Sequence, residues 1–551
     1  MPCRACHTLA CCLAALLAMP SAWANDPASQ QLRDQQQSLR QLQQQQRLER
    51  WQRAPSPDTE ESPTPETTQD SRCWPVSGVR LAGNQRLSTT ALEPTVRALV
   101  QPCMGIQAIN QLLKAITQDY VQAGYPTSRP YLRHAPHDGA PLDIVIVEGF
   151  VESVELSREL PLSLRSAFPD VLGHPLYLPE LEQGLDQLNR LRAYEVSADL
   201  MPGQMQGGTR VMLQSQQVAS RWHLDSRFDN RGSELTGRHR VTLGLGIDSP
   251  FELNDDLRLS LNTTAIDAPG SSQGAMLYYS LPHGPWTFTL NASQLRYDAP
   301  LQQTPLHSNG DSSYQGLSAE RLLWRNQRGM VSASARLDRK KLINRLGDNV
   351  IGLQSPTLTT VEAGLNLLWL DNGLWNAYLG VAQGTGWLGA DTPLQRADAP
   401  RPDFRKYRAN LLHLRQGPAN WPWRWQSELA LQYSSDVLPA IEQMLLSDDS
   451  AVRGFRLHTH AGANAAVWRN TFSQALPRSP QLRPYIGLDH GWARLATGQP
   501  SQRLMGAAAG IELNLPQSRL RLDFQRALFN SALPRSQLEP GYWVLEWALS
   551  I

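Results

Sequence analysis

The 551-residue sequence has almost no excess of charge, because 51 Lys and Arg balance 50 Asp and Glu to leave a net charge of +1. It contains no basic run, which argues against a nucleic-acid-binding protein. After the first 24 residues it also lacks an apolar run of about 18 residues, the length that a transmembrane helix needs. Nucleotide motifs and His, Cys or Asp clusters with metal-ligand spacing are absent. We therefore predict no cofactor, no metal and no nucleic-acid partner.

Cysteine is scarce, with six in the chain, and four of these lie in an N-terminal segment that reads as a signal. Arg4 supplies a positive charge, Thr8 to Met19 form a short apolar core, and residues 22–24 (Ala-Trp-Ala) have the small-x-small pattern of a cleavage site. Because this core is too short to span a membrane, we predict a secretory signal peptide over residues 1–24. The haem-attachment pattern from Cys3 to His7 would then be discarded with the signal.

Two cysteines, Cys73 and Cys103, follow the signal. An even pair of cysteines in an oxidising compartment predicts a disulfide, here across 30 positions of sequence. Two buried free thiols are the alternative.

One pattern typical of enzymes is present, since Gly270 to Gly274 fits the Gly-x-Ser-x-Gly turn of serine hydrolases. That turn needs a strand before it and a helix after it, so that the serine is held exposed at the bend. Here a polar turn leads instead into a second strand-like stretch. We therefore predict that the chain is not an enzyme and has no catalytic residues.

The segment after the signal divides into two parts. Residues 25–53 are rich in Gln and other helix formers, with no Gly or Pro from Ser29 to Arg53, which predicts a helix. Its apolar stripe is too narrow for a helix packed in a core, and consists of Leu32, Leu39 and Leu42. The helix is thus either a solvated arm or a plug in a water-filled channel. Residues 54–71 are rich in Pro, Ser, Thr and Glu, which predicts an extended or disordered linker.

Residues 72–149 and 150–218 have the patterns of two small α+β domains of similar length, which suggests a repeated unit. In the first, we predict a strand, a helix and a strand over Gly78 to Leu81, Ile106 to Ala123 and Leu142 to Val147. In the second, we predict the same order over Val151 to Leu156, Leu178 to Leu191 and Arg210 to Gln216.

Residues 219–551 alternate apolar and polar side chains in many successive stretches. In one of them, Leu520, Leu522 and Phe524 oppose Arg519, Arg521 and Asp523. Charged residues on the second face exclude a dry core but suit a water-filled lumen. The last stretch carries Glu546 on its polar face, while its apolar face consists of Trp543, Leu545, Trp547, Leu549 and Ile551. At about 20 residues per strand and connection, this region predicts a membrane β-barrel of about 16 antiparallel strands.

Together these features resemble the two-partner secretion transporters of the bacterial outer membrane, the family of haemolysin activators and filamentous-haemagglutinin transporters. Gly124 to Leu132 and Leu142 to Gly149, with the two cysteines, resemble the family's first POTRA domain. Ala167 to Leu191 resembles its second, with a helix motif made of Glu182, Gln183, Gly184, Asp186, Asn189 and Arg190. Asp229 to Arg240 resembles the first hairpin of the barrel.

Two further stretches resemble the superfamily's lumenal-loop motif and its partner on the barrel wall. The loop motif consists of Val452, Arg453, Gly454 and Phe455, and the wall stretch of Ile486 to Gly491 includes Asp489. The resemblance implies that the loop folds into the lumen, where the planar guanidinium of Arg453 binds Asp489 through two parallel hydrogen bonds. The sequence departs from the family in lacking an acidic residue between His460 and Asn470, and in ending with Ile551 rather than an aromatic residue.

The resemblance also implies a function. Two periplasmic POTRA domains would capture an unfolded exoprotein through its N-terminal secretion domain, and the barrel would pass it to the cell surface. The exoprotein could be an adhesin, a haemolysin or a contact-dependent toxin. Outer-membrane lipid, the barrel-assembly machinery and periplasmic chaperones are further expected partners. The alternatives are a barrel-assembly insertase, which normally carries more POTRA domains, and a passive porin, which would leave the two small domains and the loop motif without a purpose.

Overall fold

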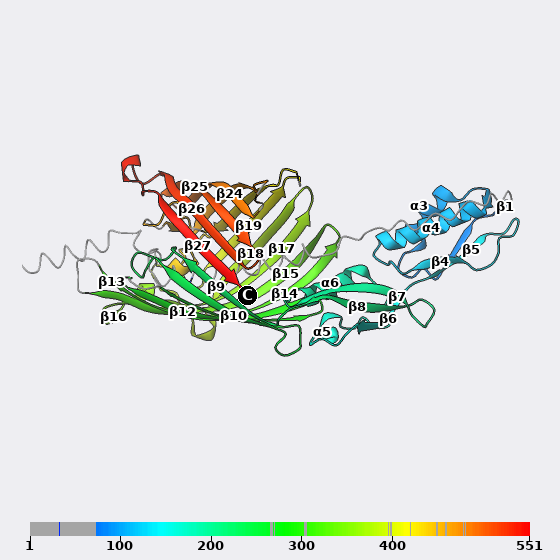
Figure 1. Ribbon diagram of the computed structural model, residues 1–551, viewed down its shortest axis with the longest axis horizontal. Coiled ribbons are helices and arrows are strands. Elements are labelled where there is room, and N and C mark those ends of the chain that lie inside the picture. Colours follow the sequence, from blue (N-terminus) through cyan, green and yellow to red (C-terminus); the bar gives the residue numbers. More distant parts are fainter. Residues whose placement is uncertain are drawn as a thin grey trace, which may run out of the picture.

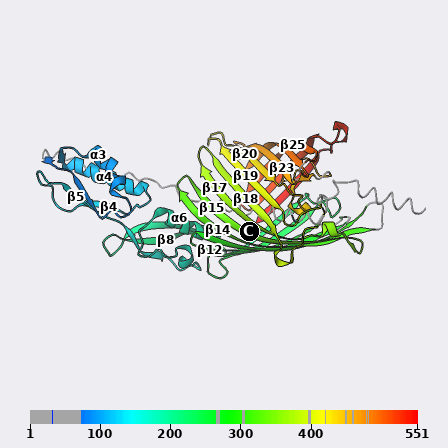
Figure 2. The same cartoon turned by 180° about the vertical axis from the view of Figure 1, so that it is seen from behind.

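The computed structural model describes Leu32 and residues 73–551, apart from 265–267, 269, 302–305, 395, 397–398, 419, 448–449, 458–459, 478, 480 and 497. The predicted signal peptide, the predicted linker and all of the predicted plug helix except Leu32 lie outside the described residues. The described part is elongated, with a barrel at one side and two small domains following one another away from it (Figure 1). Figure 2 shows from behind that the second small domain lies between the first and the barrel.

The first small domain is a three-stranded sheet with two helices. Its elements are β1 (Cys73–Pro75), β2 (Val79–Ala82), α3 (Thr89–Leu99), β3 (Cys103–Gly105), α4 (Ile106–Gln122), β4 (Arg129–Leu132) and β5 (Leu142–Val147). Strand β5 is central, with β2 parallel on one side and β4 antiparallel on the other. A disulfide between Cys73 and Cys103 joins β1 to β3.

Helix α3 is an element that the sequence analysis missed. It begins after Ser88, whose hydroxyl accepts a hydrogen bond from the Ala91 N–H at 3.2 Å, the contact typical of an N-cap. Pro94 lies inside the helix and disguises the helical pattern, because proline usually marks a helix end. The predicted α4 and β5 match the structure closely.

The second small domain repeats this arrangement. It contains β6 (Phe150–Leu156), α5 (Leu164–Ala167), α6 (Leu178–Asn189), β7 (Tyr194–Pro202) and β8 (Gly208–Val218). Strand β8 is central, with β6 parallel and β7 antiparallel to it. Strands β5 and β8 are each central in their sheets, so the two domains share one three-stranded topology.

The remaining chain forms a closed antiparallel barrel of sixteen strands within the described residues. They are β9 (Trp222–Asp229), β10 (Arg240–Asp248), β11 (Asp256–Thr264), β12 (Ser271–His283), β13 (Trp286–Pro300), β14 (His307–Asn326), β15 (Gly329–Leu346), β17 (Thr357–Leu370), β18 (Leu374–Thr385), β19 (Arg405–Gln416), β20 (Trp423–Tyr433), β23 (Asn464–Gln474), β24 (Leu482–Arg494), β25 (Ser501–Leu515), β26 (Ser518–Asn530) and β27 (Tyr542–Ser550). The two-residue β16 (Asn349–Val350) extends the hairpin that β15 begins. This architecture confirms the predicted barrel.

The two faces of the barrel strands differ as the alternation predicts. In β27, Trp543 and Trp547 are exposed on the outer face, whereas Val544 and Glu546 are buried on the inner face. Leu545 and Leu549 share the outer face at intermediate exposure, and Ile551 follows as an exposed residue. An apolar outer belt and a polar interior are the features of a barrel that spans a membrane.

Two further observations concern the hydrolase-like turn and membrane-spanning helices. The Gly-x-Ser-x-Gly stretch runs directly into β12, without the helix that a hydrolase turn requires. Within the described ranges, no helix is long and apolar enough to cross a membrane.

Candidate functional site

The segment between β20 and β23 is a long loop, which we call the lumenal loop (residues 434–463). It contains the 3-10 turn η3 (Ala440–Glu442) and the short pair β21 (Met444–Leu445) and β22 (Ala461–Gly462). Its side chains contact the inner face of the barrel, and several of them are almost fully buried although they belong to a connection. These are Leu438, Ile441, Leu446, Val452, Arg453 and Phe455.

Arg453 is 1% exposed and binds one wall carboxylate. Its Nε donates to Oδ2 of Asp489 at 2.6 Å, and its Nη2 donates to Oδ1 of the same group at 2.6 Å. The backbone N–H of Arg453 adds a third bond to Oδ2 at 3.0 Å. The guanidinium also donates to the backbone oxygen of Asn470 at 3.1 Å. A buried charge is tolerated when it is paired and hydrogen-bonded in this way.

Glycines of the wall make room for this pair. A Cβ at Gly487 would collide with the Arg453 guanidinium, and a Cβ at Gly506 would collide with the Arg453 carbonyl. At Gly491, a Cβ would lie only 2.7 Å from Cγ2 of Val452. Gly454 has a φ of +95°, a conformation that favours glycine, and it approaches the backbone of β26. The site that the loop occupies on the wall, which we call its seat, is therefore shaped by glycines as well as by charged residues.

The residues beside Arg453 pack into an apolar cluster at the wall. Val452 is fully buried and Phe455 nearly so. They cluster with small and aliphatic side chains of the loop and of β23 to β26: Leu446, Ala451, Ala465, Val467, Ala493, Leu504 and Ala527. The buried charge pair thus lies beside a dry patch, where little water competes for its hydrogen bonds.

A second charged anchor, which the sequence analysis missed, holds the loop near η3. Both carboxylate oxygens of Glu442 are bound, one by Lys340 of β15 at 2.5 Å and the other by Lys406 of β19 at 2.6 Å. Lys406 and Gln432 also donate to the Glu442 carbonyl, each at 3.1 Å. Alternation places the two lysines on the inner face, but no sequence pattern indicates that a loop glutamate lies between them.

Leu32 is the described residue of the predicted plug helix, and it lies inside the barrel. It is helical and fully buried. It belongs to a cluster with wall tyrosines and one loop residue, among them Tyr278, Tyr297, Tyr314 and Ile441. The plug position and the lumenal loop therefore share one apolar cluster, next to the Glu442 anchor.

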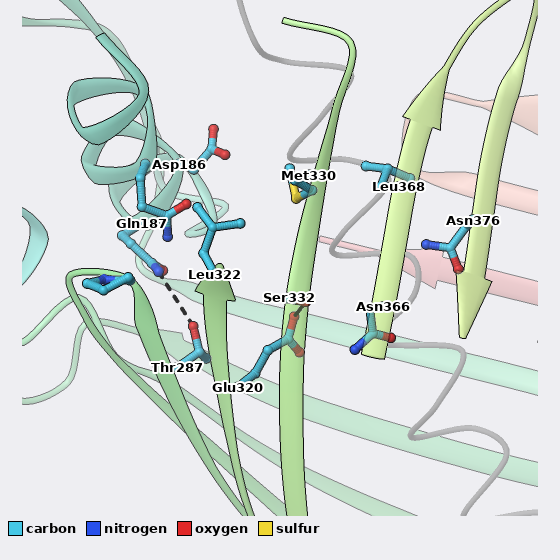
Figure 3. A pocket seen from close by; sticks show the side chains of 12 residues that line it. Asp186, Gln187, Thr287, Glu320, Leu322, Met330, Ser332, Asn366, Leu368 and Asn376 are labelled. Carbon is cyan, nitrogen blue, oxygen red and sulfur yellow. Dashed lines mark hydrogen bonds between the residues drawn. The ribbon is translucent and has the colours of Figure 1, made fainter. Parts of the chain in front are cut away.

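Helix α6 docks on the rim of the barrel. Arg325, at the end of β14, binds Oε2 of Glu182 at 2.9 Å and also pairs with Asp186. Gln187 donates to the carbonyl of Gly284 at 3.1 Å, and Figure 3 shows this side chain and Asp186 pointing from α6 toward the barrel strands. A cavity of about 40 Å³ between them has room for more than one water molecule.

The predicted motif of α6 therefore divides into contacts inside the domain and contacts with the barrel. Four residues of the motif face the barrel: Glu182, Gln183, Asp186 and Arg190. Gln183 donates to the carbonyl of Gly284, and Arg190 donates to the carbonyl of Ser280. Gly184 lies against the ring of Phe168, where a Cβ would collide. Asn189 exchanges two hydrogen bonds with the backbone of Val196, at 2.8 and 2.6 Å, and so fixes the turn into β7.

The stretch without an acidic residue joins the barrel wall only after its first residues. Ala461 and Gly462 pair with β21 inside the loop, and regular pairing with β20 begins only at Ala465. Trp468 then faces outward, and Arg469 lies opposite Asp489 in the register of β23 and β24.

Because both members of the Arg453–Asp489 pair are buried, removing one leaves the other charge without its partner. We expect Arg453→Met to lower the stability of the barrel by about 3–5 kcal/mol, and the double change of Arg453→Met with Asp489→Leu to recover most of this loss. The temperature at which the folded barrel converts to the unfolded form on a detergent gel measures both. A double variant as unstable as the single one would contradict this expectation.

The Arg325 contacts predict that this side chain fixes α6 on the rim. With spin labels at Glu159 and at Asp371 in the turn after β17, we expect Arg325→Ala to broaden the measured distance distribution. The matched control is Arg328→Ala, which removes an exposed arginine from the same hairpin. If both variants keep the narrow wild-type distribution, Arg325 does not hold the domain.

Comparison with known proteins places these features in a family. Residues 207–513 match the model of the haemolysin secretion/activation protein ShlB/FhaC/HecB. Residues 74–149 match a POTRA domain of the ShlB type, and residues 150–202 match a POTRA domain.

Individual relatives agree with this match. Hemolysin transporter protein HpmB of Proteus mirabilis is 32% identical over 84% of this chain and 83% of its own. Hemolysin transporter protein ShlB of Serratia marcescens is 32% identical over 87% of each chain. The structure of CdiB from Escherichia coli, at 25% identity, superposes with a TM-score of 0.85 over 96% of this chain and 99% of its own. The chain therefore belongs to the ShlB/FhaC/HecB family of haemolysin secretion and activation proteins, and is an outer-membrane transporter of a two-partner secretion system with periplasmic POTRA domains.

Proposed function

We propose that this transporter exports an unfolded exoprotein of the haemolysin class, and that the lumenal loop gates the path through the barrel. The observation that carries the proposal is the buried seat of the loop, where Arg453 binds Asp489 inside a polar-walled lumen. A wide barrel conducts water and solutes unless something occupies its bore. Export then requires the loop to leave its seat, while the resting state requires it to stay.

The class of exoprotein is supported by the relatives. Those at 32% identity are named haemolysin transporters, whereas the CdiB relatives are 28–29% identical. We take a haemolysin as the first candidate. A contact-dependent toxin is the second, since the CdiB structure from Escherichia coli covers nearly the whole chain. In either case the partner carries an N-terminal secretion domain.

Capture of the exoprotein is assigned to the edges of the POTRA sheets. Strands β4 and β7 are edge strands in their sheets, so their outer backbone groups are placed to pair with an added strand. Tyr131 of β4 is 56% exposed and offers an aromatic contact beside that edge. An unfolded polypeptide gains affinity from main-chain hydrogen bonds in this mode, with little demand on its sequence.

Gating is assigned to the loop together with the plug helix. The loop is held by two ion-paired anchors, and Leu32 clusters with the wall tyrosines and with Ile441, the neighbour of Glu442. We infer that the plug helix occupies the lumen at rest and that its departure loosens the Glu442 end of the loop. The linker at residues 54–71 has the composition of a flexible tether that would allow this.

The other expected partners also belong to the proposal. The outer belt of apolar side chains suits outer-membrane lipid, and assembly of such a barrel calls for periplasmic chaperones and the barrel-assembly machinery. We further propose that the chain has no catalytic activity of its own.

The gate predicts a specific secretion defect. We expect Arg453→Ala to reduce secretion of the cognate exoprotein to below about a tenth of wild type, because a loop without this anchor no longer moves between two defined positions and obstructs the bore; a change of about 1.4 kcal/mol is enough for a tenfold effect. Arg453→Lys keeps the charge without the two parallel bonds, and should give an intermediate value. Exoprotein in the culture medium is measured beside the folded barrel on a detergent gel. Arg535→Ala, on an exposed external turn, is the control, and normal secretion by Arg453→Ala would refute the gate.

The plug predicts a change in conductance. Deleting residues 25–71 should raise the single-channel conductance in planar bilayers, because the helix no longer fills the lumen. Leu32→Asp should raise it too, since a carboxylate has no place in the cluster where Leu32 is fully buried. Leu32→Met conserves volume and serves as the control. Unchanged conductance in both the deletion and Leu32→Asp would count against a resting plug.

A further inference from the structure

Three potential metal ligands meet at the rim where the barrel joins the second POTRA domain. Among the described residues, one group of His, Cys, Asp and Glu side chains is close enough to hold an ion: His223, Asp248 and Asp256, whose ligand atoms all lie within 4.8 Å of one another. They come from the adjacent strands β9, β10 and β11. Asp248 lies opposite Asp256, and His223 lies opposite Gly246, two positions before Asp248 on the same face.

His223 and Asp248 have buried polar atoms without a hydrogen-bond partner in the protein. His223 is 7% exposed, and neither of its ring nitrogens accepts or donates a hydrogen bond within the protein. Asp248 is 1% exposed, and its Oδ1 is likewise without a partner, although its Oδ2 accepts from the Ala193 N–H at 2.8 Å. A buried imidazole with both nitrogens unsatisfied costs free energy and calls for an explanation.

Both carboxylates lie near the guanidinium of Arg258. Arg258 binds Asp256, with Nη2 at 2.8 Å from Oδ2 and Nε at 3.0 Å from Oδ1. Carboxylates directly opposite on neighbouring strands repel each other. Arg258 compensates the charge of Asp256, while the Oδ1 of Asp248 has no hydrogen-bond partner within the protein.

Gly246 gives the imidazole its place. It lies between His223 and Arg258 in the register of the three strands, and a Cβ there would collide with the ring of His223. The absence of a side chain at this position leaves room for the ring over that face of the sheet.

We propose that His223, Asp248 and Asp256 bind a divalent transition-metal ion of the zinc class. One imidazole nitrogen and two carboxylate oxygens are a ligand set that zinc accepts, with a fourth position for water. Zinc–ligand bonds of about 2.0–2.2 Å require the three side chains to draw together by small rotations. The ion uses the orphan atoms of His223 and Asp248 and screens the repulsion between the carboxylates.

The bound ion joins three strands and the start of β7. Asp248 would bind it through Oδ1 while Oδ2 holds the Ala193 N–H, so the metal connects the barrel wall to the segment that follows α6. The sequence indicates no such site, because the ligands are 25 and 8 positions apart and share no motif. Only the pairing of β9, β10 and β11 brings them together.

Zinc binding by the purified full-length protein tests the proposal. The protein is prepared in detergent without a polyhistidine tag, stripped with a chelator, and titrated with zinc chloride in a calorimeter. Bound metal is counted by mass spectrometry after gel filtration. We expect one zinc per folded chain, and a loss of affinity of more than about tenfold in His223→Gln and in Asp248→Asn. His307→Gln is the matched control, since His307 is exposed and pairs with Asp298 away from the site.

Thermal stability gives a second test of zinc binding. Zinc should also raise the unfolding temperature of the wild-type barrel and not that of His223→Gln, because a ligand stabilises only the state that binds it. A folded wild-type protein that binds no zinc overturns the proposal. Equal binding by wild type, His223→Gln and Asp248→Asn shows an adventitious ion only. If one variant fails to fold, the other one decides.

Discussion

Strands β27 and β9 hydrogen-bond to each other over five residue pairs, from Glu546 opposite Asp229 to Ser550 opposite Asp225, and thereby close the sheet. Closure is imposed by the membrane, where a free sheet edge would leave backbone groups without water or protein partners. With sixteen strands, closure creates a bore too wide for wall side chains alone to fill. The polar inner face, the lumenal loop and the plug position all follow from that single geometric requirement.

A wet bore changes how the loop must be held. Apolar packing alone would tolerate several positions of the loop, whereas charges specify one. The loop brings a cation, Arg453, to a wall carboxylate, and an anion, Glu442, to two wall lysines. Moving the loop from this position would separate both sets of ion pairs and leave buried charges without partners, which costs free energy. Opposite signs at the two anchors therefore fix its register, and ion pairs of this kind contribute to specificity more than to net stability.

Sequence patterns predicted the features that depend on neighbouring residues in the chain. They did not predict contacts between residues that are far apart in the sequence. Alternation assigned Trp543 to the outer face and Glu546 to the lumen, because strand geometry alone decides this. The family resemblance supplied the roles of Arg453 and Asp489, which no periodicity contains. Glu442 escaped notice because its partners, Lys340 and Lys406, lie 102 and 36 positions away on different strands. Helix α3 was hidden by its internal proline, although its capping residue was a readable signal.

One hairpin links the two ends of the pore. Arg325, which binds α6 of the second POTRA domain, ends β14, and Lys340, which binds Glu442 of the loop, lies on β15. The two strands pair along nearly their whole length, with Tyr314 opposite Lys340, and Tyr314 belongs to the cluster that holds Leu32. Coupling between distant sites needs a continuous element whose position both sites influence. The β14–β15 hairpin is such a continuous element, because it contacts the second POTRA domain at one end and the lumenal loop farther along, and Tyr314 belongs to the cluster of Leu32.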